Sequence, residues 1–286
     1  MELTLEFARA GSLTAPAPAL DDARTQVWCD AAGHDAAYFY VAGSEYWAWL
    51  RCIGTFRIGA DGEIVVEPDP SASRPLVVDW YRRAIAPMAL QLLGIQVLHA
   101  SAVRTERGVV GFCASSQTGK STLAYGLAGW GYELFADDAL VFDVGQDDVR
   151  ALEFPFAIRL RPASAAYFGI EHVDPPELGP SSRISVGGPG NPLTAVCLLA
   201  RREPDDDQGP VAIRRVSAHE AVPRLLPQAY YFTLLGGDRK RRTLGAYLGL
   251  TAHVPIYEIR FAVALDELPE LLSAIETTVF RTPLAA

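Results

Sequence analysis

Residues 109–122 combine residue types that together can bind a polyphosphate. An apolar run, 109–113, is typical of a buried strand; small residues and Gly119-Lys120-Ser121-Thr122 follow, and a helix is expected over 123–130. This is the pattern G-x-x-x-x-G-K-[ST] between its strand and its helix. Backbone N–H groups of such a loop and of the helix N-terminus converge on phosphate oxygens. The lysine reaches the β- and γ-phosphates, and the serine hydroxyl binds Mg²⁺. The residues predicted to bind the nucleotide are Ala114, Ser115, Ser116, Gln117, Thr118, Gly119, Lys120, Ser121 and Thr122.

The loop departs from the pattern at one position. Ala114 stands where the first glycine is expected. Alanine is costly there only if the residue needs a positive φ. A loop of chance composition before a helix is the alternative, and the combined strand, loop, G-K-S-T and helix argue against it.

Two adjacent carboxylates, Asp137 and Asp138, follow the predicted helix. They lie between two short apolar runs, Glu133–Ala136 and 139–142, which we expect to be strands. Neighbouring side chains at a strand end point in different directions. One carboxylate can then hold a metal while the other orients a hydroxyl and takes its proton, as phosphoryl transfer requires. The alternative is a solvated turn, a common setting for two aspartates.

Weaker candidates accompany this pair. His99 lies in an apolar run, 96–103, where a histidine is either a satisfied core residue or part of a site. Arg159 and Arg161 alternate along a strand predicted over 154–160, so they share one face. That face either meets the γ-phosphate or an anionic substrate, or it is solvated. On the first interpretation, Arg159 is included among the predicted nucleotide-binding residues. The basic run 239–242 either binds nucleotide or an acidic peptide or, as we expect, is an exposed helix start.

The elements that must position these residues are both strands and helices. The first part is rich in β-strand patterns, at 3–7, 37–41, 47–58 and 63–66, with an Asp61-Gly62 hairpin turn. A helix is expected over 76–93, kinked or split at Pro87. Strands at 96–103, Gly108–Cys113, 193–200, Val211–Val216 and 255–261 follow, with helices at 218–226, 239–252 and 266–279. Residues 171–191 are predicted to be a loop, and Asp205-Asp206-Asp207 an acidic turn joining two strands.

These elements predict an α/β (α+β) fold in two domains. Residues 1–75 form a smaller N-terminal β-rich domain, and residues 76–286 form the domain that carries the phosphate loop. Substrate selection is expected from the N-terminal region and from the loop 171–191.

Composition excludes several classes. The 286 residues have a formal net charge of -9 and a pI of about 5.1, which argues against a dedicated nucleic-acid binder. Four dispersed cysteines predict buried thiols in a reducing compartment and no zinc site. The N-terminus does not resemble a signal peptide, and the longest uncharged stretch, 84–103, is too interrupted to be a membrane helix. We therefore expect a cytoplasmic protein with no membrane or nucleic-acid partner; homo-oligomerisation is left open.

Three segments of the chain resemble the catalytic core of the HPr kinase/phosphorylase family. They are Leu98-His99-Ala100-Ser101, the loop A-S-S-Q-T-G-K-S-T, and G-Y-E-L-F-A-D-D at 131–138. The resemblance is closer to the stand-alone HprK-like kinases often found with peptide natural-product pathways. The same core is similar to that of phosphoenolpyruvate carboxykinase, so the resemblance implies a carboxykinase-like P-loop core.

The resemblance implies ATP- and Mg²⁺-dependent phosphorylation of a hydroxyl, usually a serine of a small protein or peptide. By this analogy Lys120 binds phosphate, Ser121 binds metal, Asp137 is the catalytic base and Asp138 is a metal-side carboxylate. His99 matches a histidine close to the phosphates, so the implied catalytic residues are Asp137, Lys120 and His99.

The chain departs from that family in two places. Tyr132 replaces the histidine of the family's G-H pair, and the glycine-rich signature that follows the aspartates in the bifunctional enzyme is absent. The absence of that signature weighs against a reverse phosphorylase activity and against HPr itself as the substrate. Two other functions stay open: a non-catalytic nucleotide-binding module, which would bind ATP without turnover, and a nucleotide hydrolase, which would turn it over with water alone.

Overall fold

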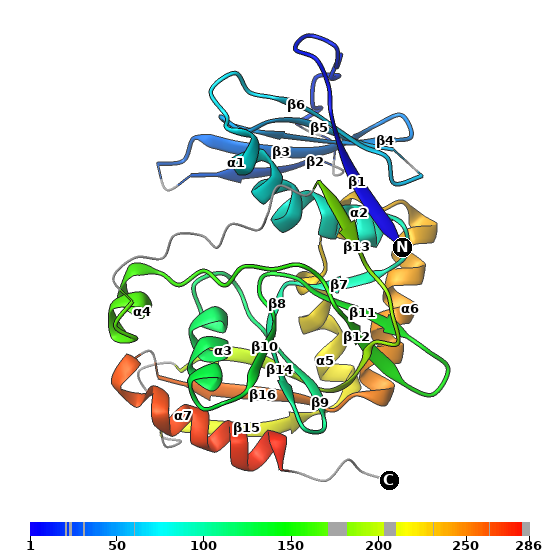
Figure 1. The fold of residues 1–286 in the computed structure, drawn as a ribbon. Coiled ribbons are helices and arrows are strands. Elements are labelled where there is room, and N and C mark those ends of the chain that lie inside the picture. Colours follow the sequence, from blue (N-terminus) through cyan, green and yellow to red (C-terminus); the bar gives the residue numbers. More distant parts are fainter. Residues whose placement is uncertain are drawn as a thin grey trace. The chain divides into compact units, whose positions relative to one another are not determined.

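The computed structural model describes residues 1–20, 22, 25–30, 32–59, 61–170, 182–202, 210–230, 232–262 and 264–281, and it has a mixed α+β fold (Figure 1). The chain divides into two compact units. Unit 1 comprises Met1–Gln96, Leu178–Val186 and Tyr230–Thr243, and unit 2 comprises Val97–Glu177, Gly187–Ala229 and Leu244–Ala286. The division differs from the boundary expected at residue 75, because the helical segment after that residue belongs to unit 1.

Unit 1 is built on a sheet that, in the described residues, has seven strands in the order β13-β1-β6-β5-β4-β3-β2. Neighbours are antiparallel except for β1 and β6, which are parallel. The predicted Asp61-Gly62 turn is confirmed, since β5 and β6 pair antiparallel with Ile58 opposite Ile64. The strands are β1 (Glu2–Phe7), β2 (Thr25–Cys29), β3 (Asp35–Ala42), β4 (Glu45–Leu50), β5 (Gly54–Ile58), β6 (Ile64–Pro68) and β13 (Arg183–Ser185).

The helix expected over 76–93 is present in three consecutive pieces. They are α1 (Arg74–Trp80), a π-helical turn (Tyr81–Ile85) and α2 (Ala86–Leu92). Ser73 caps the first piece by accepting a hydrogen bond from the Leu76 N–H. Pro87 cannot donate to the preceding turn, and the π-helical turn directly before it accommodates the missing hydrogen bond.

Unit 2 is built on a second sheet, which has nine strands in the described residues. Its order is β10-β8-β9-β14-β12-β11-β7, with β16 pairing β14 and β15 pairing β16. β9, β14 and β16 are mutually parallel, so their carboxyl ends share one edge. The strands are β7 (Gln96–Leu98), β8 (Ala100–Thr105), β9 (Gly108–Cys113), β10 (Glu133–Ala136), β11 (Leu140–Val144), β12 (Val149–Leu152), β14 (Asn191–Arg201), β15 (Val211–Val216) and β16 (Ile256–Phe261).

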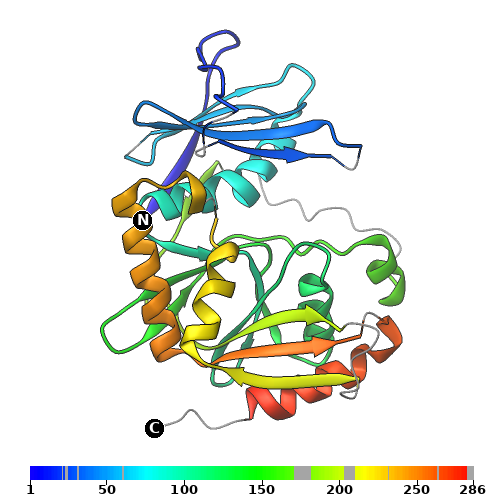
Figure 2. The same ribbon diagram turned by 180° about the vertical axis from the view of Figure 1, so that it is seen from behind.

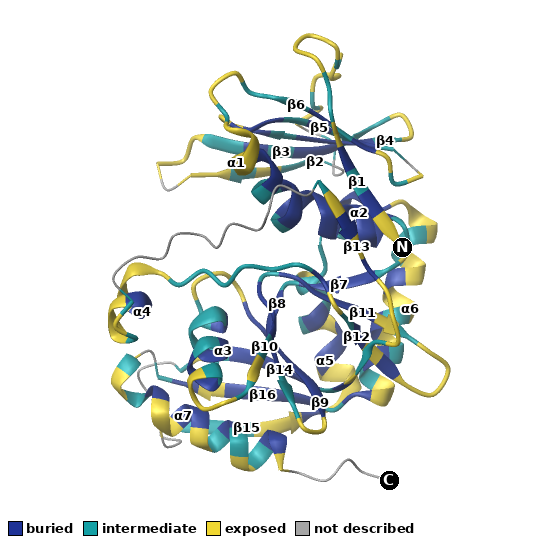
Figure 3. Cartoon of the chain, in the orientation of Figure 1, coloured by how far each residue is buried: buried dark blue, intermediate teal, exposed yellow. Residues whose placement is uncertain are grey.

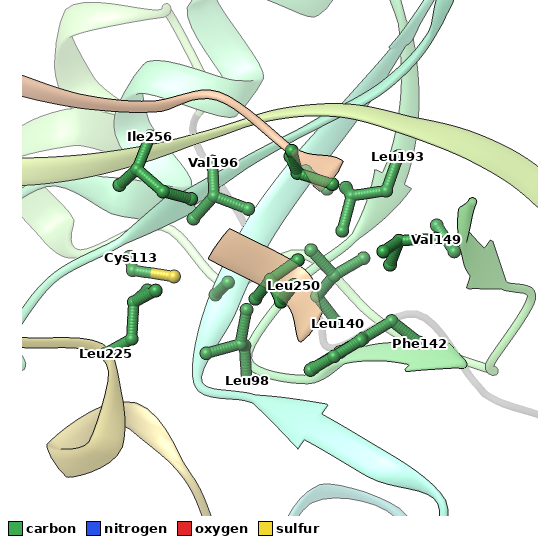
Figure 4. Close-up of a cluster of buried hydrophobic side chains, with 14 of the residues drawn as sticks. Leu98, Cys113, Leu140, Phe142, Val149, Leu193, Val196, Leu225, Leu250 and Ile256 are labelled. Atoms are coloured by element: carbon green, nitrogen blue, oxygen red, sulfur yellow. The ribbon is translucent and has the colours of Figure 1, made fainter. Parts of the chain in front are cut away.

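Two apolar clusters cover this sheet. One joins it to α5 (Ala218–Leu225) and α6 (Gly237–His253) through Leu225 and Leu250 (Figures 2 and 4). The other joins it to α3 (Lys120–Gly129) and α7 (Leu268–Ile275). Both faces of β9 are buried, as Figure 3 shows, and this explains why its sequence is a continuous apolar run. No helix in the described ranges is long and apolar enough to cross a membrane.

One sequence prediction about unit 2 is wrong, and two of its elements were not predicted. Residues 154–160 form no strand; Pro155 removes a ladder donor there, and β12, which the sequence analysis missed, takes the place beside β11 and β14. β14 and β15 are not paired with each other, because β16 lies between them. α4 (Pro162–Tyr167) was also missed.

The predicted loop 171–191 is only partly testable. Residues 171–181 and the acidic turn 205–207 lie outside the described residues, whereas Arg183–Ser185 form strand β13 against β1 of unit 1. The loop prediction is therefore wrong for those three residues.

Gly108 begins β9 and is expected to tolerate no side chain. Its φ is +137°, and a Cβ there would lie 2.3 Å from the Pro192 carbonyl oxygen. Gly108→Ala should lower the free energy of unfolding by about 2 kcal/mol or more, measured by urea denaturation. Gly129→Ala, at a helical glycine with no atom within 4 Å of the new Cβ, is the matched control and should change stability by less than about 1 kcal/mol. Equal effects in the two variants would contradict the steric explanation.

Candidate functional site

The phosphate loop lies between β9 and α3, as predicted, entirely within unit 2. Among the described non-glycine residues, positive φ occurs at Cys52, Gln117 and Asp138. Ala114 is not one of them, so alanine at the first glycine position carries no conformational cost. Gln117 (φ 71°) and Gly119 (φ 114°) are left-handed within the loop. Left-handed residues within a loop are typical of turns whose backbone N–H groups converge on an anion.

Lys120 is buried beneath this loop, with a relative exposure of 6%. Its Nζ donates to the Ala114 carbonyl oxygen at 3.0 Å. Burial lowers the pKa of the Lys120 ammonium, and the nearby charges of Asp138 and Asp137 oppose that shift. The loop residues above it, Ser115 to Gln117, are exposed, so an anion can reach the loop while the cation stays inside it.

Asp137 collects hydrogen bonds from three separate segments. Its Oδ1 accepts from Ser121 Oγ at 2.8 Å and from Ser101 Oγ at 2.6 Å, and its Oδ2 accepts from the Arg159 backbone N–H at 3.2 Å. The residue is buried, with 4% exposed. Burial and the charge of Asp138 raise the pKa of the Asp137 carboxyl, although the three hydrogen bonds act in the opposite direction. Asp137 is therefore joined to the phosphate loop through Ser121.

Asp138 points elsewhere because of its backbone. Its φ is 62°, and the Ala139 N–H donates to the Asp137 carbonyl oxygen at 2.8 Å, which closes a γ-turn of the strained, positive-φ kind. The Asp138 Oδ1 lies 3.8 Å from Nε2 of His99, and both side chains are more than one third exposed. The prediction that the two carboxylates diverge is confirmed.

The structure relates the remaining predicted residues to this site in different ways. Thr122 Oγ1 lies 2.8 Å from Ser164 Oγ, so its hydroxyl joins α3 to α4. Arg159 reaches Asp137 through its backbone N–H, and Arg161 precedes α4 instead of sharing a strand face with it. The run 239–242 belongs to unit 1, where Arg239 donates to Tyr46.

Tyr132, which replaces the family's histidine, takes no part in the site. Its hydroxyl donates to Glu276 at 2.7 Å, and its ring packs edge-on against Phe280. Burial and this carboxylate raise the pKa of Tyr132 to about 12. The residue anchors the C-terminal helical segment.

Two participants were missed by the sequence analysis. Ser101 was noted only as part of a motif, and its partner Asp137 is 36 residues away. Arg201, the last residue of β14, donates from its guanidinium to the Gln117 carbonyl oxygen of the loop. Only the parallel pairing of β14 with β9 brings Arg201 there, and no local signal in the sequence reports that pairing.

The residues around Ser121 fit a magnesium ion bound together with a nucleotide. Ser121 Oγ and Asp137 Oδ1 lie 2.8 Å apart, and both are oxygen atoms of the kind that binds Mg²⁺. Within the described ranges no group of three or more His, Cys, Asp or Glu side chains could form a metal cage. Mg²⁺ commonly takes one or two protein oxygens and completes its shell with phosphates and water.

Comparisons with known proteins give a distant likeness to solved structures. No family model and no curated protein matches the chain. Among solved structures, the HPr(Ser) kinase/phosphatase from Coxiella burnetii is similar over 65% of this chain and 88% of its own, with 15% identity and a TM-score of 0.34. A likeness this low leaves the function of the site to be judged from its own contacts.

The raised pKa of Asp137 predicts that the difference in the free energy of unfolding between wild type and Asp137→Asn depends on pH. The folded chain retains the Asp137 proton at a pH where the unfolded chain, with a carboxyl pKa near 3.8, releases it. The folded state therefore binds more protons, and this carboxyl loses stabilising effect as pH rises through its folded pKa. Asp137→Asn does not titrate, so its free energy of unfolding should rise relative to wild type from about pH 4 upward. Urea denaturation without nucleotide or metal measures this slope. The opposite slope would mean that the hydrogen bonds outweigh burial.

Proposed function

We propose that unit 2 is an ATP- and Mg²⁺-dependent kinase with a carboxykinase-like P-loop core. It transfers the γ-phosphoryl group of ATP to a hydroxyl, preferentially a serine of a small protein or peptide, in the cytoplasm. The observation that carries this proposal is the shared oxygen of Asp137, which accepts from Ser121 of the phosphate loop and from Ser101. This hydrogen-bond network makes the loop and the acidic pair parts of one site, as phosphoryl transfer to an acceptor requires.

The contacts favour a division of roles between the aspartates that differs from the one implied by family resemblance. Asp137 is buried and bonded to Ser121, which suits a carboxylate that orients the metal side of the site. Asp138 is exposed and lies near His99, which suits the side that meets the acceptor. We therefore assign Ser121 and Asp137 to the metal side, and Asp138 with His99 to the acceptor side. A bound magnesium ion would neutralise charge on the phosphates.

In this arrangement Lys120 and the backbone N–H groups of the loop hold the β- and γ-phosphates. Asp138 accepts the proton of the acceptor hydroxyl as its oxygen bonds to the γ-phosphorus. The bond between that phosphorus and the β–γ bridging oxygen breaks, and ADP leaves with the electron pair. General-base assistance of this kind contributes on the order of 10²–10⁴-fold to the rate.

Incubation of the purified chain with γ-labelled ATP, Mg²⁺ and a library of serine-containing peptides tests the proposal. Label in peptide, absent with Lys120→Ala, is the expected result. Nucleotide binding without transfer to any acceptor would support the non-catalytic module instead. Rapid release of labelled phosphate with no acceptor present would support the hydrolase.

A further inference from the structure

One face of the unit 1 sheet carries a row of aromatic side chains. Tyr40 is opposite Trp47, and Tyr38 is opposite Trp49, on the paired strands β3 and β4. On β5, Arg57 is opposite Trp47, and Thr55, two residues away, lies on the same face. Glu67 on β6 is opposite Thr55, so Arg57 and Glu67 share this face. We call it the outer face, because the buried apolar side chains of the same strands, such as Phe39 and Phe56, point the other way.

Residues 8–20, which follow β1, cross the outer face, and we call this segment the strap. Glu67 accepts from the backbone N–H groups of Gly11 and Leu13 at 2.8 and 2.9 Å. The Tyr40 hydroxyl donates to the Pro16 carbonyl oxygen at 2.8 Å. Thr25 Oγ1 donates to the Ala19 carbonyl oxygen at 2.7 Å. Because these anchors are on β6, β3 and β2, the strap passes over β5 and β4 between the first two.

Side chains of the sheet bind the strap through the strap's backbone. Each of these four hydrogen bonds ends on a strap N–H or C=O group, so an extended peptide of different sequence could make them. Pro16 and Pro18 fix φ near the extended region and leave the carbonyls free to accept, as in peptides that bind aromatic grooves in a polyproline conformation. Most strap residues are themselves exposed, including Leu20 at 59%. The strap therefore buries little apolar surface of its own, and segments of this kind open readily.

The outer face also has a donor that the strap does not use. Trp47 is 4% exposed, and within the described residues its Nε1 has no hydrogen-bond acceptor. Its neighbour Tyr40 is 3% exposed and bonded to the strap. Buried indole N–H groups usually find a partner, and an extended proline-containing peptide carries free backbone carbonyls that can accept from them.

We propose that the outer face of unit 1 is a docking surface for an extended, proline-containing peptide segment of a different protein, and that the strap occupies it in cis. The incoming segment replaces the strap on Glu67 and Tyr40 and supplies a carbonyl oxygen to Trp47. This surface belongs to unit 1 and the phosphate loop belongs to unit 2, so the inference does not depend on the proposed function.

The test uses the full chain and the synthetic peptide AGSLTAPAPAL, which is residues 10–20. Replacing Pro16 and Pro18 by glycine in the protein removes the preorganisation of the strap. Hydrogen exchange should then be faster at the Gly11 and Leu13 amides than in wild type. Since a tethered segment competes at an effective concentration of order mM, the glycine variant should bind the peptide at least about tenfold more tightly than wild type by calorimetry. A peptide with both prolines replaced by glycine should bind more weakly.

Two tyrosines provide a matched control on the same strand and face. In the glycine-strap background, Tyr40→Phe removes the hydroxyl that meets the peptide and should weaken binding several-fold. Tyr38→Phe removes a hydroxyl that is bonded to Asp35, and it should leave the affinity unchanged. Trp47→Phe removes the unused donor and should also weaken binding.

Several outcomes would overturn the proposal, each in a variant with a wild-type circular dichroism spectrum. They are unchanged amide exchange in the glycine variant, no peptide binding by it, equal binding of the proline-free peptide, and equal effects of the two tyrosine substitutions. Concentration-dependent dimerisation of the glycine variant would identify a second copy as the occupant and would overturn it as well.

Discussion

Lys120→Met is expected to abolish nucleotide binding and to lower phosphoryl transfer on the order of 10²–10³-fold, while leaving the folded chain as stable as wild type or more stable. The ammonium is the cation that the phosphate loop encloses, and removing one preorganised donor of this kind commonly costs 10²–10³-fold in rate. Without nucleotide, the same ammonium is buried on the Ala114 carbonyl oxygen. A methionine of similar length removes a charge that is costly to bury.

The pH dependence of stability tests the effect of Lys120→Met on folding separately from its effect on nucleotide binding. Burial lowers the pKa of Lys120 below that of the unfolded chain, so between the two values the unfolded chain binds more protons. Raising the pH through that interval therefore stabilises wild type, and Lys120→Met should lack this gain. Thermal unfolding across alkaline pH and calorimetric titration with an ATP analogue measure the two parts of the prediction.

Lys240 provides the matched control, since Lys120 and Lys240 are the two lysines of the chain. Lys240 lies near the Phe232 ring, in unit 1. Lys240→Met should bind nucleotide as wild type does. Nucleotide binding by Lys120→Met at wild-type affinity would remove the basis for the proposed site.

Local sequence signals predicted the reactive segments of unit 2 well. The strand, loop and helix around Lys120 and the two strands flanking Asp137 were expected at nearly the bounds observed. These features depend on short-range rules: residue periodicity, small residues in a turn and the divergence of adjacent side chains. The sequence analysis also stated correctly what decides the conformational cost of Ala114, because that cost depends on the φ of this one residue.

Features that depend on long-range pairing could not be predicted in this way. The hydrogen bond of Ser101 to Asp137 requires β8 and β10 to be neighbours, and the Arg201 contact requires β14 to extend beyond β9. Apolar strands buried on both faces carry no alternation that would report their neighbours. For the same reason the position of β16 between β14 and β15 was not predicted. The divergence between the two aspartates was predicted, but their hydrogen-bond partners were not.

Asp138→Gly is expected to raise the free energy of unfolding by about 1 kcal/mol while lowering phosphoryl transfer on the order of 10²–10⁴-fold. Glycine adopts φ 62° without the penalty that a Cβ carries, so the substitution relieves the strained turn. It also removes the like charge that raises the pKa of Asp137, which should fall. Strain of this kind persists where function requires it, so stability and activity should change in opposite directions. Urea denaturation and single-turnover transfer measure the pair of effects.

Asp138→Asn and Asp137→Asn divide the roles between the two carboxylates. Asparagine carries the same Cβ as aspartate and adopts the left-handed region equally well, so Asp138→Asn should keep the turn and its strain but still lose transfer, with nucleotide affinity changed by less than about tenfold. Asp137→Asn should instead raise the Mg²⁺ concentration needed for half-maximal transfer, because Asp137 holds the Ser121 hydroxyl. If the magnesium requirement moves with Asp138 and the acid limb of the pH–rate profile disappears with Asp137, the roles are those implied by the family resemblance, and the contact between Ser121 and Asp137 is structural alone.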